Sequence, residues 1–359
     1  MIDASSLHLH HLVDAALQEE AADLYMKGGS VPYVKKFSAV IPLAGEWPVI
    51  DNANAERIIR EMMDDRMNKI FNELMDFDLG FTIPNKCRVR MNIYMERGNF
   101  ATACRVVPLR IKSIEELGLP PILSELTKHQ NGLILVTGPT GSGKTTTLAA
   151  MIDLINKRRK NHIVTIEDPI EFVHPDQQSY VSQREVGIDS AEFKNALRAA
   201  LRQAPDVILI GEMRDNETIN IALQAGETGH FVFSTVHTAS AYETMDRVIN
   251  MFPPHEKHYL SQRMSNALRA VISQKLVPRA DGNGRVCAME ILICTPTVTK
   301  MIEDASFRDL YGAMNDGAFW GMQTMNQSLL KYVKAGVITE EVAIQYAGVV
   351  SELKQMFRR

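Results

Sequence analysis

A glycine-rich stretch at residues 138–145, Gly-Pro-Thr-Gly-Ser-Gly-Lys-Thr, has the residue types and spacing that bind phosphate groups. The apolar run before it (133–137) predicts a buried strand, and the residues from Thr145 onward predict a helix. Glycines let backbone N–H groups converge on oxygens, and a helix N-terminus adds partial positive charge. The alternative is a glycine turn that fits the pattern by chance, but such a turn would not be expected between a buried strand and a helix. The sequence therefore predicts a nucleoside triphosphate site.

Two side chains of this stretch have specific expected roles. Lys144 should reach the β- and γ-phosphates, and the Thr145 hydroxyl should ligate Mg²⁺. The residues expected to hold the nucleotide are Gly138, Pro139, Thr140, Gly141, Ser142, Gly143, Lys144, Thr145 and Thr146.

An acidic segment follows the apolar run at 163–166, where a second buried strand is expected. Hydrolysis needs a carboxylate that orients or deprotonates a water in line with the γ-phosphate. Glu167, Asp168 and Glu171 are the candidates. The alternative is a solvated acidic turn that caps a helix, because acidic residues favour both positions.

A further acidic residue, Glu212, follows the apolar run at 207–210. Four apolar residues and then an acid form the Walker B pattern, in which a carboxylate holds Mg²⁺ through its water shell. Aspartate usually comes first in that pattern. Here Gly211 takes that position, so Glu212 is the expected magnesium partner.

Two histidines, His230 and His237, flank the apolar run at 231–235. A histidine at a strand end can donate a hydrogen bond to a γ-phosphate, whereas a histidine beside an apolar strand is more often structural. Parallel strands bring such residues together, since ligands bind at the carboxyl ends of the strands in open α/β sheets. From the residues alone both readings stay open, with His237 as a candidate catalytic contact and His230 as a candidate nucleotide-binding residue.

The length of 359 residues is enough for two domains, each with its own core. The net charge of −4 and the 45% hydrophobic content indicate a globular protein without the basic excess typical of nucleic-acid binders. No stretch has the form of a signal peptide or a membrane span, so we expect a cytoplasmic protein. Four scattered cysteines without a C-x-x-C pair predict buried, reduced thiols.

The predicted first domain covers residues 1–107 and mixes helices with strands. Its expected elements are a helix near 7–19, a strand at 22–26, a helix at about 54–74, and paired strands at 87–94 and 101–107.

A linker at 108–120, with prolines at its ends, precedes the second domain at 121–359. Short apolar runs between helical segments favour a parallel sheet covered on both faces. From about residue 255 the pattern is mostly helical, interrupted by a turn at 281–284 and a strand near 286–293, and the C-terminal part from about 295 is expected to be helical.

Four motifs in fixed order resemble the Walker A, Asp box, Walker B and His box of the secretion-superfamily ATPases. They are the phosphate loop and the segments 165–172, 211–215 and 228–238. Among these ATPases the chain is similar, over nearly its whole length, to the type IV pilus retraction family, PilT and PilU. Extension and secretion members are longer and usually carry a four-cysteine zinc site, which this chain lacks.

The resemblance implies a PAS-like N-terminal α+β domain, a RecA-like P-loop ATPase domain, and a homo-hexameric ring at the cytoplasmic face of the inner membrane. ATP with Mg²⁺ would sit at the domain junction, and domain rotation would turn a PilC-like platform protein to disassemble the pilus. By position, Glu171 would be the catalytic carboxylate, Glu212 the Mg²⁺ partner and His237 the γ-phosphate contact. Arginines of the N-terminal domain approach the nucleotide in this family, and Arg90 and Arg105 are favoured here over Arg97. Each could equally be a strand-surface arginine.

The chain departs from PilT near its C-terminal helices, where residues 297–304 replace an arginine-containing motif and hold no arginine. The segments 201–206 and 276–282 and the tail after Tyr346 are closer to PilU, so we interpret the chain as PilU-like. One alternative is an accessory nucleotide-binding subunit that depends on a paralogous retraction motor. A RecA-like nucleic-acid motor is a second alternative.

Overall fold

The computed structural model describes residues 3–36, 39–84 and 86–358. The chain divides into two compact units, which are described separately. The first contains residues 1–110 together with 171–173, and the second contains the remainder. The division after Arg110 falls inside the segment expected to link two domains.

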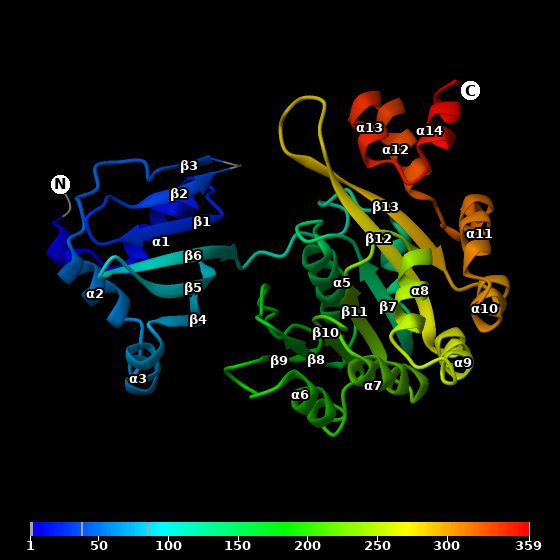
Figure 1. Ribbon diagram of the computed structural model, residues 1–359, viewed down its shortest axis with the longest axis horizontal. Helices are drawn as coiled ribbons and strands as arrows, with labels where there is room; N and C mark the ends of the chain where they lie inside the picture. Colours follow the sequence, from blue (N-terminus) through cyan, green and yellow to red (C-terminus); the bar gives the residue numbers. More distant parts are fainter. Residues whose placement is uncertain (1–2, 37–38, 85, 359) are drawn as a thin grey trace. The chain divides into compact units, whose positions relative to one another are not determined.

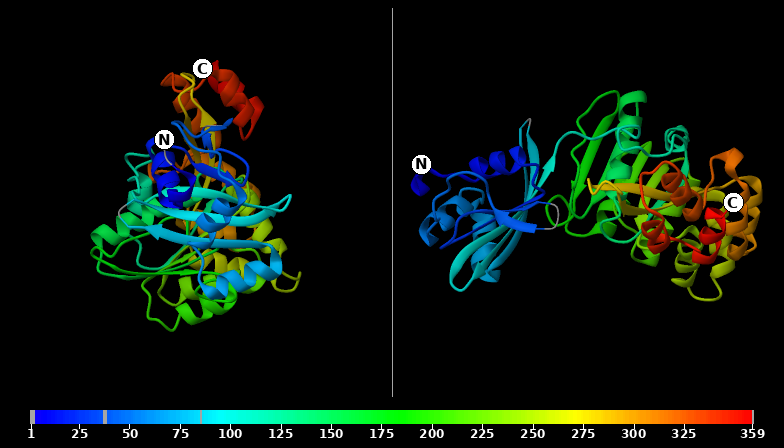
Figure 2. Two further views of the ribbon diagram at one scale, coloured as in Figure 1. Left: turned by 90° about the vertical axis from the view of Figure 1, so that its left-hand side faces the viewer. Right: turned by 90° about the horizontal axis from the view of Figure 1, so that it is seen from above.

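The first unit is built on a six-stranded antiparallel sheet, in the order β3-β2-β1-β6-β5-β4 within the described residues. Its helices are η1 (Ala4–Ser6), α1 (Leu9–Gln18), α2 (Asn52–Arg60) and α3 (Asp65–Leu74). Its strands are β1 (Asp23–Lys27), β2 (Tyr33–Lys36), β3 (Ala39–Pro42), β4 (Asp76–Ile83), β5 (Cys87–Glu96) and β6 (Asn99–Pro108). Along β5, buried and half-buried side chains alternate, as expected for a strand with one face on a core. The helices supply the other half of that core (Figure 2).

The single helix expected at about 54–74 is wrong, because the structure has two helices there. Asp64 adopts an extended backbone, and its carboxylate accepts a hydrogen bond of 2.7 Å from the Met67 backbone N–H, so it begins α3 as an N-cap. The apolar spacing continues across the break, with Ile58 and Ile59 fully buried and Met63 nearly so. Hydrophobic periodicity alone therefore does not detect the cap.

The second unit is built on a seven-stranded sheet, in the order β13-β12-β7-β11-β10-β8-β9 (Figure 1). All neighbouring strands are parallel except β12 and β13, which are antiparallel. The strands are β7 (Gly132–Thr137), β8 (His162–Glu167), β9 (Tyr180–Glu185), β10 (Val207–Ile210), β11 (Phe231–Val236), β12 (Leu268–Pro278) and β13 (Arg285–Ile293). The helices that connect or cover them are α4 (Ile122–Leu126), α5 (Lys144–Arg158), α6 (Phe193–Ala200), α7 (Asn216–Glu227), α8 (Ala241–Asn250) and α9 (Lys257–Ala267).

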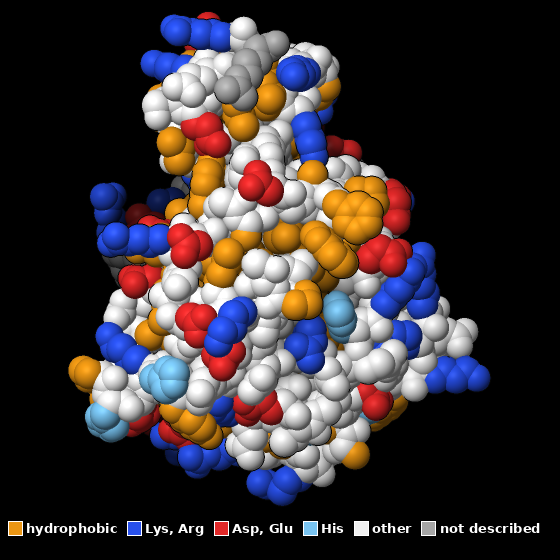
Figure 3. All heavy atoms as spheres, turned by 90° about the vertical axis from the view of Figure 1, so that its right-hand side faces the viewer, with side chains coloured by type: hydrophobic (Ala, Val, Ile, Leu, Met, Phe, Trp, Pro, Cys, Tyr) orange, Lys and Arg blue, Asp and Glu red, His pale blue; other side chains and the backbone are white. Residues whose placement is uncertain are grey.

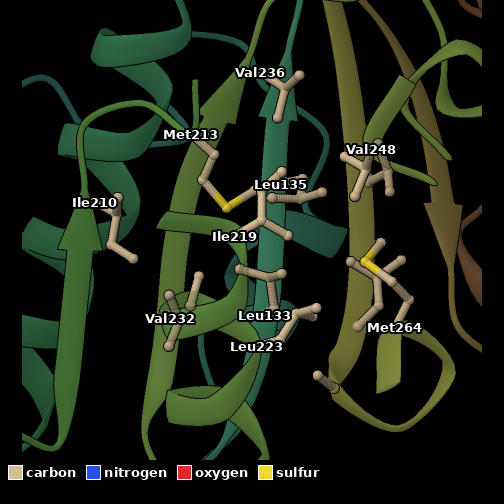
Figure 4. Close-up of a cluster of buried hydrophobic side chains, with 14 of the residues drawn as sticks. Leu133, Leu135, Ile210, Met213, Ile219, Leu223, Val232, Val236, Val248 and Met264 are labelled. Atoms are coloured by element: carbon tan, nitrogen blue, oxygen red, sulfur yellow. The ribbon is translucent and has the colours of Figure 1, made fainter. Parts of the chain in front are cut away.

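The central strands β7, β10 and β11 are buried on both faces, and alternate residues of β7 go to opposite faces. Leu133 and Leu135 pack with α6, α7, α8 and α9 in one core, part of which is drawn in Figure 4. Ile134 and Val136 pack with α4 and α5 in the other core. Each of these four side chains is fully buried. Such two-sided burial explains the continuous apolar runs in the sequence.

Two strands of this sheet are absent from the sequence-based expectation. The pattern beyond residue 255 predicts mostly helix before the turn at 281–284, yet β12 occupies 268–278. It begins directly after α9, so no turn residue marks the change from helix to strand. β9 pairs in parallel with β8 at the sheet edge and was also not expected.

The C-terminal part is helical from Pro296 onward, as expected. Its helices are α10 (Pro296–Glu303), η2 (Phe307–Asp309), α11 (Leu310–Asp316), η3 (Ala318–Trp320), α12 (Met325–Lys334), α13 (Glu340–Tyr346) and α14 (Val350–Phe357). The last three pack with the outer ends of β12 and β13 around Val277 and Ala288. All four cysteines are free thiols, and Cys87, Cys104 and Cys287 are buried. Among the described residues, no helix combines the length and apolar character needed to cross a membrane.

The N-cap at Asp64 gives a test of the split between α2 and α3. Asp64→Ala should lower the free energy of unfolding by about 1 kcal/mol, because a helix N–H loses its acceptor. Urea denaturation followed by circular dichroism measures the loss. Asp65→Ala is the matched control, since Asp65 is exposed and lies in the first turn but is not the cap. Equal losses for both variants would contradict the assigned cap.

Candidate nucleotide-binding site

The expected site residues follow neighbouring strands at one edge of the sheet. The register pairs Thr137, the last residue of β7, with Val236 of β11, and pairs Ile210 of β10 with Ser234. The loops that follow β7, β10 and β11 therefore leave the sheet side by side. Such an edge, at the carboxyl ends of parallel strands, is where open α/β sheets bind ligands.

The loop at 138–143 connects β7 to α5 in a conformation that requires glycine. Gly138 has φ +143°, and a Cβ there would lie 2.4 Å from the Gln274 carbonyl oxygen. Gly143, with φ +88°, is the N-cap residue of α5, whose first residue is Lys144. The loop thus passes close to β12 and delivers the N-terminus of a long helix to the sheet edge, where it favours an anion.

Lys144 is only 8% exposed, so its charge needs internal partners. Its ammonium group donates to the carbonyl oxygens of Gly138, at 2.8 Å, and Pro139, at 3.1 Å. It also lies 3.5 Å from Nδ1 of His237. The other imidazole nitrogen, Nε2, lies 3.3 Å from Oε1 of Glu212. The structure thus joins three of the expected site residues in one polar chain.

Glu212 is fixed from both sides of its carboxylate. The second oxygen, Oε2, accepts a hydrogen bond of 2.8 Å from Nε of Arg214. Its loop is tied to β11, because Thr235 Oγ1 donates to the Gly211 carbonyl at 2.7 Å. A Cβ on Gly211 would approach the Ile166 carbonyl oxygen to 3.2 Å, so a side chain at the position usually held by aspartate would be crowded here.

The three candidates for the water-directing carboxylate have different surroundings. Glu167 is 6% exposed and accepts hydrogen bonds from Thr165 Oγ1, at 2.7 Å, and Gln183 Nε2, at 3.2 Å. These contacts give Glu167 a structural role at the end of β8. Asp168 is exposed. Glu171 is half-exposed and groups with the first unit.

Within that first unit, Glu171 forms an ion pair with Arg90, whose Nη1 lies 3.5 Å from Oε1. Arg90 on β5 is the cross-strand partner of Arg105 on β6. A hydrogen bond of 2.9 Å to Asp23 raises the pKa of Arg105, and the charge of Glu171 acts in the same direction. Three expected site residues are therefore neighbours here. Arg97 lies instead in the turn between these strands, with φ +51°.

His230 is not brought to the phosphate loop. It precedes the first residue of β11, whereas His237 follows the last, so the two histidines lie at opposite ends of one strand. The His230 backbone carbonyl accepts from the N–H of Gly132 at the start of β7, and its Nδ1 lies 3.1 Å from the Ala225 carbonyl oxygen. We therefore leave His230 out of the proposed site.

Sequence reasoning missed three residues that support the site. Gln274, on β12, donates from Nε2 to the Ser142 carbonyl at 2.7 Å and so ties the phosphate loop to the sheet. Ser273 accepts a hydrogen bond from Thr137 Oγ1, also at 2.7 Å. Arg247 of α8 donates to the backbone carbonyl of His237 at 2.8 Å. The first two could not be found because β12 itself was not predicted.

The site fits a nucleotide and a magnesium ion in its chemistry. It combines a mostly buried ammonium group, a helix N-terminus and glycines that leave room for oxygens. The buried Ser142 hydroxyl has no hydrogen-bond partner among the described residues. No cluster of three or more His, Cys, Asp or Glu able to hold a metal exists in the described part of the chain. Mg²⁺ does not require such a cluster, because it keeps several waters and relies on substrate phosphates. These features define a P-loop nucleotide-binding domain.

Comparisons with known proteins place this domain in a family. Residues 102–342 match the family described as type II/IV secretion system protein. The chain is 40% identical over 341 residues to the type IV pilus retraction ATPase PilT of Pseudomonas aeruginosa, covering 95% of this chain and 98% of PilT. It is 34% identical over 352 residues to PilU of the same organism, covering 98% and 92%.

A crystal structure of the pilus retraction motor PilT with bound ADP matches the chain with a TM-score of 0.91. The match has 39% identity and covers 98% of this chain and all of the other. The ATPase DotB of Legionella pneumophila matches with a TM-score of 0.79 at 26% identity, covering 94% of each chain.

The chain belongs to the type II/IV secretion system protein family. Within that family it is a PilT/PilU-type ATPase, an enzyme that hydrolyses ATP. The expected fold class, a PAS-like α+β domain followed by a RecA-like ATPase domain with C-terminal helices, is confirmed.

The interpretation as PilU-like is not supported by identity over the whole chain, which is higher to PilT. The comparisons also do not favour the accessory subunit or the nucleic-acid motor. On the face drawn in Figure 3, acidic and basic side chains are interspersed rather than gathered into a basic field.

Gln274 provides a test of how the phosphate loop is supported. Its side chain is 1% exposed, so Gln274→Ala leaves the Ser142 carbonyl without its donor. The variant should lose about 1–3 kcal/mol of stability and bind ATP about tenfold more weakly. Isothermal titration calorimetry measures the affinity.

Ser273→Ala is the matched control on the same strand. It removes the hydrogen bond to Thr137 but leaves the loop contact, so it should lower stability and keep the affinity. Parental ATP affinity in Gln274→Ala would contradict the supporting role.

Proposed function

We propose that the chain is one subunit of a hexameric motor that powers type IV pilus retraction, and so twitching motility. It would act peripherally at the cytoplasmic face of the inner membrane on a PilC-like platform protein, either alone or with a paralogous retraction ATPase. The observation that carries the proposal is the polar chain of Lys144, His237 and Glu212 beside the phosphate loop. The near full-length identity of 40% to PilT supports it.

The proposed catalytic roles follow from the chemistry of each group. Lys144 exchanges its loop carbonyls for phosphate oxygens, which accept its hydrogen bonds more strongly because they are charged. His237 then turns its donor toward the γ-phosphate. Glu171 accepts a proton from the attacking water or orients it. Glu212 and the Thr145 hydroxyl would hold Mg²⁺, which would supply positive charge to neutralise the phosphates.

Arg90 and Arg105 supply positive charge from the first unit. A guanidinium stays charged and grips phosphate oxygens with two parallel hydrogen bonds, which suits a group that stabilises charge in the transition state. Their pairing as cross-strand neighbours, with Glu171 beside Arg90, supports a shared role.

Deletion of the gene tests the cellular function. The mutant should lose twitching motility and keep its surface pili, since filaments would assemble but not retract. Electron microscopy of the cell surface and motility at an agar interface are the measurements. Loss of the surface pili would indicate extension and would contradict the proposal.

Two substitutions separate hydrolysis from binding. Glu171→Gln keeps the shape but loses the base, so phosphate release should fall at least about 100-fold while ATP affinity stays near that of the parent. Lys144→Ala should lose affinity itself, because the buried cation of the loop is gone. Steady-state phosphate release and calorimetry are the two measurements. Undiminished phosphate release from Glu171→Gln would remove Glu171 from its assigned role.

A further inference from the structure

Arg214 lies beside Glu212 in the nucleotide site but has no role in the proposed catalytic steps. It lies two residues beyond Glu212 in the loop after β10, and its side chain is 70% exposed. Its Nε nevertheless donates to Oε2 of Glu212 at 2.8 Å, the shorter of the two polar contacts made by that carboxylate.

Both oxygens of Glu212 are therefore engaged by protein groups. The tautomer of His237 follows from its neighbours: Nδ1 faces the Lys144 ammonium group, which only donates, so Nδ1 accepts and Nε2 carries the hydrogen. Nε2 then donates toward Oε1 of Glu212 at 3.3 Å. The result is a continuous hydrogen-bonded chain that runs from Lys144 through His237 and Glu212 to Arg214.

The two partners of Glu212 differ in how they respond to a nucleotide. His237 leaves the carboxylate when it turns to the γ-phosphate. Arg214 has no such reason to leave, because its guanidinium is charged and its partner is an anion. Arg214 would then stay on Oε2 and leave Mg²⁺ a carboxylate whose charge is already partly neutralised.

We propose that Arg214 is a positioning residue that competes with Mg²⁺ for the Glu212 carboxylate and so sets how strongly Mg²⁺ tightens nucleotide binding. The proposal rests on the proposed role of Glu212 as the magnesium partner. The effect is modest in size, since the pair is partly exposed to solvent and exposed ion pairs are weak.

The test compares the dissociation constant of a fluorescent ATP analogue in EDTA with that in Mg²⁺, using the full chain. The dissociation constant in EDTA divided by the dissociation constant in Mg²⁺ measures how much Mg²⁺ tightens binding. Arg214→Gln removes the charge and should raise this ratio about 2- to 5-fold. Arg214→Lys keeps the charge and should stay near the parent, whereas Arg214→Met is a second uncharged replacement should the glutamine variant fold poorly.

Arg198→Gln is the matched control. Arg198 is an exposed arginine of the same unit that is paired with Glu217, and its loss should leave the ratio unchanged. A merely structural role of Arg214 would change both dissociation constants equally and leave the ratio constant. An unchanged or lowered ratio in the uncharged variants overturns the proposal.

A Glu212→Gln background separates the proposed role of Arg214 from the proposed role of Glu212 as the magnesium partner. The effect of Arg214→Gln should disappear there, because the two residues act through one carboxylate. If Glu212→Gln keeps the full tightening by Mg²⁺, then Glu212 is not the magnesium partner. If it loses the tightening while Arg214→Gln behaves as the parent, then only the role of Arg214 fails.

Discussion

The charge of Lys144 is the constraint on which the rest of the site depends. An ammonium group that is almost completely buried is costly unless every donor finds an acceptor. The phosphate loop supplies two carbonyl oxygens, and His237 supplies a nitrogen. Because these acceptors belong to the protein, the loop is already folded around the Lys144 ammonium group before a nucleotide binds. A phosphate chain then replaces weaker, neutral acceptors with charged ones.

The sheet makes this arrangement rigid. Strands β7, β10 and β11 are fully or nearly fully buried on both faces, so their ends cannot shift independently. β12 adds a second support, since Gln274 bonds to the loop while the Gln274 carbonyl restricts residue 138 to glycine. Motion is left to side chains and loops, namely Lys144, His237 and the segment with Glu212 and Arg214. The site therefore changes its hydrogen-bond partners without changing the sheet.

Much of the site could be predicted from the sequence because its parts are local. The glycine loop lies between an apolar run and a helix, and Glu212 and His237 lie just beyond two other apolar runs. Parallel pairing of the three strands is enough to bring these residues to the same edge of the sheet. The predictions that failed depended on structure that no local sequence pattern marks. β12 follows α9 without a turn residue, and Asp64 interrupts an apolar spacing that continues across it. His230 shows that the same residue type at the wrong end of a strand gives no contact with the loop.

We infer that a bound nucleotide draws Lys144 and His237 away from their partners within the protein. A crystal structure of the full chain with Mg²⁺ and a non-hydrolysable ATP analogue tests it most directly. We expect the Lys144 ammonium group to leave the carbonyl oxygens of Gly138 and Pro139 for the phosphates, and His237 Nε2 to leave Glu212 for the γ-phosphate. Retention of all these contacts beside a bound nucleotide would contradict this inference.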